Sequence, residues 1–401
     1  MLVAIRRFIF VVSWMPRERV VSENNRGGAM NLSRVFFILI AVSCGGCGQQ
    51  ETVDNSGVEA MGRGDFRTAI EEFTVLIEKQ PEMAGAYAYR GMAYFSLARE
   101  DPANIDKAIA DFSKAIELKP KEEELARLLG QRAKAYIAQQ KLQLAIDDLT
   151  TLIRLHPDIE GNYVFRAECR YAKQDPEGAV EDLRKAAQIA PQNVLVLAKL
   201  AERTGDIGLF TESLKACDRF IELAPPTEQH LGHRIRANIY FRQKKFKEAI
   251  DEFSMVLGRF PADADAHYHR GLARLQIGQL EDAIADFTKA IEAQPKLLLA
   301  YLQRALCHEK TGNRESAIDD LTQAISMAPQ KPEPYFHRGR LLVEAGKPKE
   351  AIENFTELIK QAPSAKAYRA RSAAHKAAGN AKAASEDEAQ AARRENPKKG
   401  S

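Results

Sequence analysis

Apolar and small residues recur along this chain with a helical spacing, and the whole pattern repeats itself several times. The ten residues AIADFTKAIE at 283–292 repeat AIADFSKAIE at 108–117, with Thr288 in place of Ser113. Ten prolines mark the same repeat: Pro81, Pro120, Pro157, Pro191, Pro225, Pro261, Pro295, Pro329, Pro363 and Pro397. From Pro261 onward the prolines are evenly spaced, about 34 residues apart, and the earlier steps equal this or are slightly longer. One repeating unit with small insertions therefore underlies the chain.

The second half of each unit carries an apolar stripe that ends at the proline. Ala283 and Phe287, for example, are four residues apart and share one face of a helix. The small member of this pair recurs as Ala69, Ala108, Ala145, Ala179, Ser213, Ala249, Ala283, Ala317 and Ala351. The large member recurs as Phe73, Phe112, Leu149, Leu183, Cys217, Phe253, Phe287, Leu321 and Phe355. We predict a helix in each second half, which the proline ends.

The first half of each unit has a stripe of its own. An aromatic residue or His is followed four residues later by Gly or Ala, in the pairs Tyr87/Gly91, Tyr163/Ala167, His233/Ala237, His267/Gly271, Tyr301/Ala305 and Tyr335/Gly339. The small residue allows two helices to approach closely. Glycines at the predicted turn between the helices are Gly64, Gly278, Gly312, Gly346 and Gly379. The pattern predicts about ten two-helix hairpins in tandem.

This recurring order of aromatic, small and proline places resembles the tetratricopeptide repeat. The resemblance covers residues 58–397 and implies an all-α fold, a right-handed α-solenoid of about ten tandem 34-residue helix-turn-helix repeats. Three units depart from the pattern. The first has a degenerate leading helix, the second carries an insertion at 101–105, and the unit that ends at Pro225 has lost its aromatic residues.

Comparison of the units shows a recurring pair of charged residues. An Arg stands just before the small residue of the first helix, and an acid stands just before the apolar residue of the second. The pairs are Arg90/Asp111, Arg132/Asp148, Arg166/Asp182, Arg236/Glu252, Arg270/Asp286, Arg304/Asp320 and Arg371/Asp387, with Arg338/Asn354 as a neutral variant. In one unit both places change together, to Leu200 and Ala216. We therefore expect structural salt bridges; an arginine ladder for anionic ligands is the alternative.

The resemblance also implies a binding function. In a stack of hairpins the first helices line an extended concave groove, which in this family holds a peptide or a protein segment. The places that face the groove are Phe165, Arg234, Asn238, Phe241, Tyr268, Leu302, Gln303, Phe336 and Arg340. Aromatic residues and Arg are types that anchor interfaces. The alternative is that some of these side chains only cover neighbouring helices.

Composition and charge narrow the function classes. The chain of 401 residues is 45% hydrophobic and 28% charged, which is typical of a soluble globular protein. The formal charge is +3, but residues 1–43 hold six bases and only two acids, so the remainder is close to neutral. Such a balance argues against a nucleic-acid binder. We expect a protein or peptide partner.

Candidate chemistry is sparse. His230 and His233 are three residues apart, but His233 occupies an aromatic packing place, and His267 and His269 point to different sides of a helix. The chain has no Gly-rich phosphate loop and no nucleophile elbow. We predict no metal, no cofactor and no enzymatic activity. An architectural spacer is the alternative to a binding adaptor, and an enzyme is the least favoured interpretation.

The N-terminal sequence predicts a targeting signal. Residues 30–43 have one base, Arg34, followed by eight apolar residues, too few to span a bilayer but typical of a signal peptide. Residues 41–44 (AVSC) resemble a bacterial lipobox, in which Cys44 is the lipid attachment, although Leu is usual where Ala41 stands. An ordinary signal peptide or a weak membrane anchor is the alternative.

These segments give the expected domain organisation. Residues 1–29 precede a complete signal, so we expect translation to start at Met30 and the mature protein to lack them. Residues 44–57 are polar and Gly-rich and are expected to be a flexible tether, followed by the repeat array at 58–397 and a tail at 398–401. The predicted location is the bacterial cell envelope, with the array facing the periplasm or the exterior. Of the five cysteines, Cys169, Cys217 and Cys307 lie in helical sequence and are expected to be buried.

Overall fold

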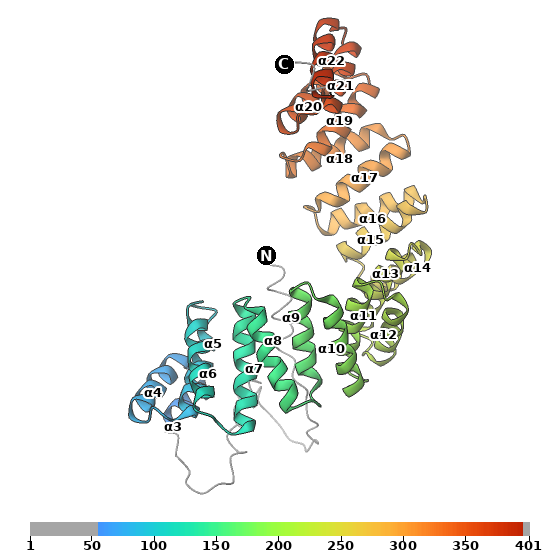
Figure 1. The fold of residues 1–401 in the computed structure, drawn as a ribbon. Coiled ribbons are helices and arrows are strands. Elements are labelled where there is room, and N and C mark those ends of the chain that lie inside the picture. The colour runs from blue at the N-terminus through green and yellow to red at the C-terminus, as the bar shows by residue number, and fades with distance from the viewer. Residues whose placement is uncertain (1–54, 396–401) are drawn as a thin grey trace, which may run out of the picture. The chain divides into compact units, whose positions relative to one another are not determined.

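The computed structural model describes residues 55–395, and these residues form twenty α-helices and no strand (Figure 1). The helices are α3 (Asn55–Arg63), α4 (Phe66–Lys79), α5 (Ala84–Leu97), α6 (Asn104–Glu117), α7 (Glu122–Ala138), α8 (Leu142–Leu155), α9 (Glu160–Ala172), α10 (Pro176–Ile189), α11 (Val194–Asp206), α12 (Phe210–Leu223), α13 (Gln229–Arg242), α14 (Phe246–Arg259), α15 (Ala264–Gln276), α16 (Leu280–Ala293), α17 (Leu298–Lys310), α18 (Arg314–Met327), α19 (Pro332–Glu344), α20 (Pro348–Gln361), α21 (Ala365–Ala377) and α22 (Ala381–Glu395).

Within α3–α6 and within α7–α22 each helix packs on the next, and each odd-numbered helix forms one hairpin with its successor. The predicted all-α tandem array is confirmed. Contacts divide it into two compact units, one with α3–α6 and one with α7–α22. The first helix begins at Asn55, three residues before the expected start of the array, so residues 55–57 of the expected tether are helical. Gly57 already packs on Phe73, since a Cβ added at this glycine would stand 2.9 Å from the ring.

In every described hairpin except α5–α6, the turn between the two helices holds one residue in the left-handed region. Gly64, Gly278, Gly312, Gly346 and Gly379 all have φ between 73° and 79°, as the glycine pattern predicted. Gly208 has the same conformation in the α11–α12 turn, with φ of 82°. Gln140, Gln174 and Lys244 occupy the equivalent place in other hairpins with φ of 60°, 65° and 59°. A residue with a Cβ is strained there, so tertiary packing imposes the turn where the sequence does not favour it.

Close packing within a hairpin depends on the small residue of the first helix. A Cβ added at Gly91, Gly271 or Gly339 would stand 2.8, 2.8 or 2.7 Å from the ring of Phe112, Phe287 or Phe355. These three phenylalanines are at most 1% exposed. The glycines let the second helix approach far enough to bury the rings.

In the larger unit the first helices of successive hairpins approach one another. Contacts join α11 to α13, α15 to α17 and α19 to α21, whereas no two successive second helices among the described residues approach as closely. At these three places the first helices form the inner side of a local bend. We call the surface of the first helices that does not pack on the second helices the inner wall.

Candidate protein-binding surface

The structure brings all seven expected Arg/acid pairs together. In α17 and α18, Arg304 donates from Nε to Oδ2 of Asp320 at 2.9 Å and from Nη2 to Oδ1 at 2.6 Å. The shortest distances in the other pairs are 2.8 Å for Arg90–Asp111, 2.7 Å for Arg132–Asp148, 2.6 Å for Arg166–Asp182, 2.8 Å for Arg236–Glu252, 2.7 Å for Arg270–Asp286 and 2.7 Å for Arg371–Asp387. Their acid side chains are 3% to 13% exposed. The two-point geometry of Arg304 is typical of strong Arg–carboxylate pairing, whereas Arg236 divides its contacts between Glu252 and Asp218.

A third contact, which sequence reasoning missed, joins successive hairpins. The remaining nitrogen of the Arg, Nη1, donates to a hydroxyl on the second helix of the preceding hairpin. The pairs are Arg90–Thr74 at 3.1 Å, Arg166–Thr150 at 3.1 Å, Arg270–Ser254 at 2.9 Å, Arg304–Thr288 at 2.9 Å, Arg338–Thr322 at 2.9 Å and Arg371–Thr356 at 3.1 Å. The signal was present, because Thr or Ser recurs two residues after the acid.

Three hairpins depart from this arrangement. In α3 and α4 the Arg place is Ser56, whose hydroxyl donates to Glu72 at 3.1 Å. In α11 and α12 the two places are Leu200 and Ala216, and both belong to one buried hydrophobic cluster. In α19 and α20 Arg338 donates to the amide oxygen of Asn354 at 2.8 Å, and burial lowers the pKa of Arg338. The nearby charge of Glu350 favours the guanidinium but does not outweigh the effect of burial.

These contacts bear on the choice between a structural ladder and an anion-binding ladder. Arg304 uses Nε, Nη1 and Nη2 on groups of the protein itself, and its hydrogen bond to Asp320 raises its pKa. Asp286 receives Arg274 at 2.7 Å and His267 at 3.0 Å in addition to Arg270. Guanidinium groups that are satisfied in this way have little capacity left for a ligand. The geometry favours the structural interpretation.

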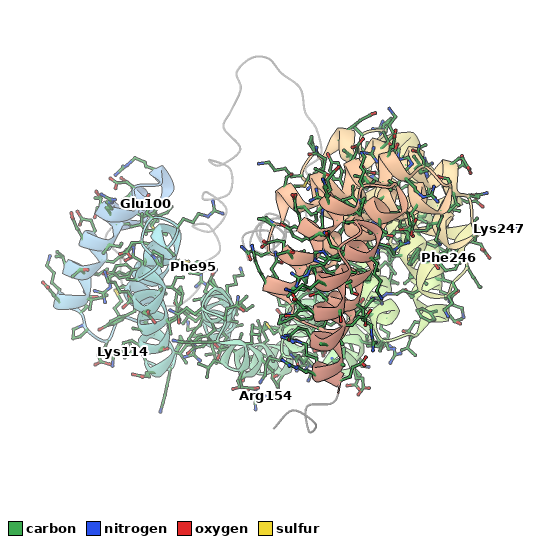
Figure 2. The ribbon with its side chains drawn as sticks, turned by 90° about the horizontal axis from the view of Figure 1, so that it is seen from above. Phe95, Glu100, Lys114, Arg154, Phe246 and Lys247 are labelled. Carbon is green, nitrogen blue, oxygen red and sulfur yellow. The ribbon has the colours of Figure 1, made fainter. Side chains whose placement is uncertain are left out.

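The residues expected to face the groove all lie on first helices of the larger unit. Five of them are half-buried and pack against the core of their own region: Phe165, Phe241, Tyr268, Leu302 and Phe336. Phe241 also meets Phe246, labelled in Figure 2, with ring centroids 5.4 Å apart. These side chains cover neighbouring helices and present only part of their surface.

The polar members of the set are more exposed or ion-paired. Arg234 pairs with Asp263, and Arg340 pairs with Glu309 of α17 and with Glu344 at 2.9 Å. Asn238 is exposed and Gln303 is half-exposed. Three leucines of the inner wall that the sequence did not single out are more exposed than the predicted aromatics. Leu231 is 43% exposed, Leu299 48% and Leu306 36%.

The cysteines, possible metal ligands and helix lengths of residues 55–395 bear on thiol, metal and membrane chemistry. Within residues 55–395, no three His, Cys, Asp or Glu side chains gather in a way that could hold a metal ion. Cys169, Cys217 and Cys307 are buried and unpaired, and burial raises the pKa of their thiols to about 12, 12 and 11. No helix from α3 to α22 combines the length and apolar character of a membrane-spanning segment. The predicted lipid site, Cys44, and the rest of residues 1–54 lie outside the described residues.

The fold and its inner wall define the class of the protein, an α-helical repeat scaffold. Tetratricopeptide repeat models match residues 55–123, 130–194, 236–297 and 336–399, and a further one matches 298–331. The chain therefore belongs to the tetratricopeptide repeat family, whose members are non-catalytic scaffolds for protein–protein interaction. The unmatched stretch at 195–235 contains α11 and α12, the hairpin with Leu200 and Ala216.

Individual relatives are similar over limited lengths. Human (Homo sapiens) tetratricopeptide repeat protein 13 is 27% identical over 129 residues, which cover 32% of this chain and 14% of that protein. Hsc70-interacting protein 1 of Drosophila melanogaster is 28% identical over 136 residues, with coverages of 34% and 32%. A solved tetratricopeptide repeat protein from Parabacteroides merdae ATCC 43184 is 22% identical, with coverages of 60% and 94% and a TM-score of 0.43. The alignments thus span less than a third of the two curated relatives.

Proposed function

We propose that this protein is an adaptor that binds a peptide or a protein segment on its inner wall. The carrying observation is that first helices expose leucines there, since Leu231, Leu299 and Leu306 are 36% to 48% exposed. A purely solvated wall would present polar side chains at these places. Apolar side chains next to aromatic residues and arginines are typical of interface anchors. The relative Hsc70-interacting protein 1 is named for an interaction with Hsc70, which is in keeping with this proposal.

The second part of the proposal is anchoring in a bacterial envelope. Support comes from the sequence, in which residues 30–43 resemble a signal peptide and residues 41–44 resemble a lipobox. Lipidation of Cys44 would place the array on the outer side of the cytoplasmic membrane, facing the periplasm or the exterior. The membrane contact would then be made by the lipid alone.

Cross-linking within the envelope tests the adaptor function. The test variant replaces Phe241, Tyr268 and Phe336 by Ala. The control variant replaces three apolar side chains of second helices, Val75, Leu144 and Met255, which are 46%, 45% and 58% exposed. We expect a specific cross-linked partner to disappear in the test variant and to persist in the control. Circular dichroism confirms that both variants remain folded.

The alternative function, an architectural spacer, predicts a different result. A spacer holds its attachments at a distance and does not need the inner wall. An unchanged set of cross-linked partners in a folded test variant would therefore contradict the adaptor and favour the spacer.

Labelling with a fatty-acid analogue tests the anchor. The wild-type chain should incorporate the label, and Cys44→Ala should abolish it. Cys47→Ala, which changes the other cysteine of the same segment, is the matched control and should label normally. Equal labelling of the wild type and Cys44→Ala would show that the lipobox interpretation is wrong.

A further inference from the structure

A cavity opens on the inner wall between α19 and α21, the first helices of the last two described hairpins. It has a volume of about 360 Å³ and lies among the start of α19, the end of α20 and the start of α21. Phe336, Leu358 and Ala367 give it an apolar lining, and the last two are 6% and 1% exposed. The volume is about ten times the roughly 30 Å³ that one water occupies in the liquid, so a large side chain fits.

The mouth of this cavity carries a cation without an acidic partner. The Nζ atom of Lys366 lies 4.2 Å from the centroid of the Phe336 ring, and no ion pair of Lys366 occurs within residues 55–395. Lys366 stands in the first turn of α21, which contains no acid. Backbone N–H groups at the start of a helix add positive potential. An anionic group is therefore favoured on the α21 side of the mouth.

The opposite side of the mouth belongs to α19. Glu333 lines the cavity there and lies in the first turn of its own helix. The N-terminal N–H groups of α19 offset part of its negative charge. The two sides thus differ in sign, which orients an occupant with its carboxylate towards Lys366.

The inner wall continues beyond the cavity in both directions. On α17, Leu299, Leu302 and Leu306 are spaced by three and four residues, so they share one helix face. The pair between Glu309 and Arg340 ties α17 to α19. On the other side, Arg369 of α21 is already ion-paired with Glu395 at 2.6 Å. A chain seated in the cavity can therefore run on along the leucines of α17.

From these observations we propose that the cavity binds an apolar side chain of an internal segment of a partner protein, and that a neighbouring Asp or Glu of that segment pairs with Lys366. The inference rests on the proposed adaptor function and names the chemistry of its ligand. Phe336 and Leu358 bury the apolar side chain, while Lys366 selects the acidic neighbour.

A library of blocked peptides tests this inference on the full chain. The peptides are acetylated and amidated, carry a central Leu, Phe or Ser, and have Glu, Gln or Lys next to it. Binding is measured by fluorescence anisotropy with wild type, Lys366→Glu and the charge-matched control Lys296→Glu, which changes an exposed lysine in the turn between α16 and α17. A further control repeats the library with free C-terminal carboxylates.

We expect Leu or Phe with an adjacent Glu to bind best, and Lys366→Glu to weaken these peptides at least tenfold while Lys296→Glu leaves them unchanged. Equal binding of Glu-, Gln- and Lys-flanked peptides would overturn the inference. The same holds if Lys366→Glu behaves like Lys296→Glu, or if only peptides with a free C-terminal carboxylate bind.

Failure of the inference can be told apart from failure of the adaptor function. If Leu231→Ser on α13 abolishes peptide binding and Lys366→Glu does not, the adaptor function stands and the cavity is not its site. If no peptide binds and the cross-linking experiment finds no partner lost from the inner-wall variant, both are wrong.

Discussion

Arg304 on α17 donates a hydrogen bond of 2.9 Å to the hydroxyl of Thr288, which belongs to the preceding hairpin. Thr288 in turn donates to the carbonyl oxygen of Ile284 at 2.8 Å, so its hydroxyl is held ready to accept from the Arg. The same Arg closes its own hairpin through Asp320. One guanidinium group therefore joins three helices, and its repetition along the chain couples neighbouring hairpins.

Replacing Arg304 tests this coupling. We expect Arg304→Leu to lower the free energy of unfolding by a few kcal/mol, because Asp320, with a side chain only 6% exposed, loses its cation. The double variant with Asp320→Ala should recover much of the loss, since it recreates the Leu200/Ala216 combination of α11 and α12. Urea denaturation followed by circular dichroism measures both.

Two results would contradict a structural role for the Arg304–Asp320 pair. Equal instability of the single and the double variant would refute direct pairing. A fully stable Arg304→Leu chain that loses a bound anionic ligand would instead support the arginine ladder as a ligand site.

Asn354 allows the reverse experiment, in which a charge is added. It is the neutral residue that stands where other hairpins have the acid of the Arg/acid pair. We expect Asn354→Asp to raise the free energy of unfolding by about 1 kcal/mol, since a carboxylate would accept a charge-assisted hydrogen bond from Arg338. Burial now lowers the pKa of Arg338, and the charge of Glu350 offsets this effect only in part. Thermal denaturation should place Asn354→Asp above the wild type and Asn354→Ala below it. A destabilising Asp would contradict the prediction.

Gly271 tests the packing of the hairpins. A Cβ there would stand 2.8 Å from the ring of Phe287, so we expect Gly271→Ala to destabilise the chain by about 1 to 3 kcal/mol. The lower end of this range is favoured, because Ala237 occupies the place equivalent to Gly271 in the α13–α14 hairpin. Ala237 packs there in one cluster with Phe253. Gly130→Ala is the matched control, since its Cβ would meet Leu152 at an ordinary 3.8 Å. Higher helix propensity should make that variant up to about 1 kcal/mol more stable.

Glu212 carries a prediction on pH. Arg184 donates to it at 2.8 and 2.7 Å across the α10–α12 contact, where the ladder is interrupted, and this hydrogen bonding lowers the pKa of Glu212. Because the folded pKa is lowered, the pair stabilises the fold fully above the ordinary pKa of 4.5 and loses this effect as the pH falls. Both groups are partly exposed, so Glu212→Gln should cost at most about 1 kcal/mol at pH 7. The difference from wild type should vanish in denaturation curves at acidic pH; a constant difference would contradict it.

The buried cysteines carry the last prediction. With a pKa of about 12, the thiols of Cys169 and Cys217 are almost entirely protonated at pH 8. We expect alkylation of both, and of Cys307, to be at least roughly a thousandfold slower in the folded chain than in denaturant. Mass spectrometry of the resulting peptides distinguishes them from Cys44 and Cys47. Rapid alkylation in the folded chain would show that these helices open readily.

The sequence alone determined the helical hairpins, their number and the partners within each hairpin. The same packing problem recurs in every unit, so places such as Ala283 and Phe287 could be identified by their recurrence. The simultaneous change to Leu200 and Ala216 indicated which charged places meet, since a buried carboxylate without its Arg would be unfavourable. These relationships lie within one unit and depend on local helix geometry.

Only the tertiary structure decided the relationships between units. The bond from Arg304 to Thr288 depends on the offset between successive hairpins, which side-chain packing sets. The start of the first helix at Asn55 became evident only because Gly57 fits against Phe73. Likewise, the exposure of Leu306 and the cavity beside Phe336 result from how first helices are spaced along the inner wall. The repeat pattern does not encode that spacing, because it arises from the volumes of many side chains packed together.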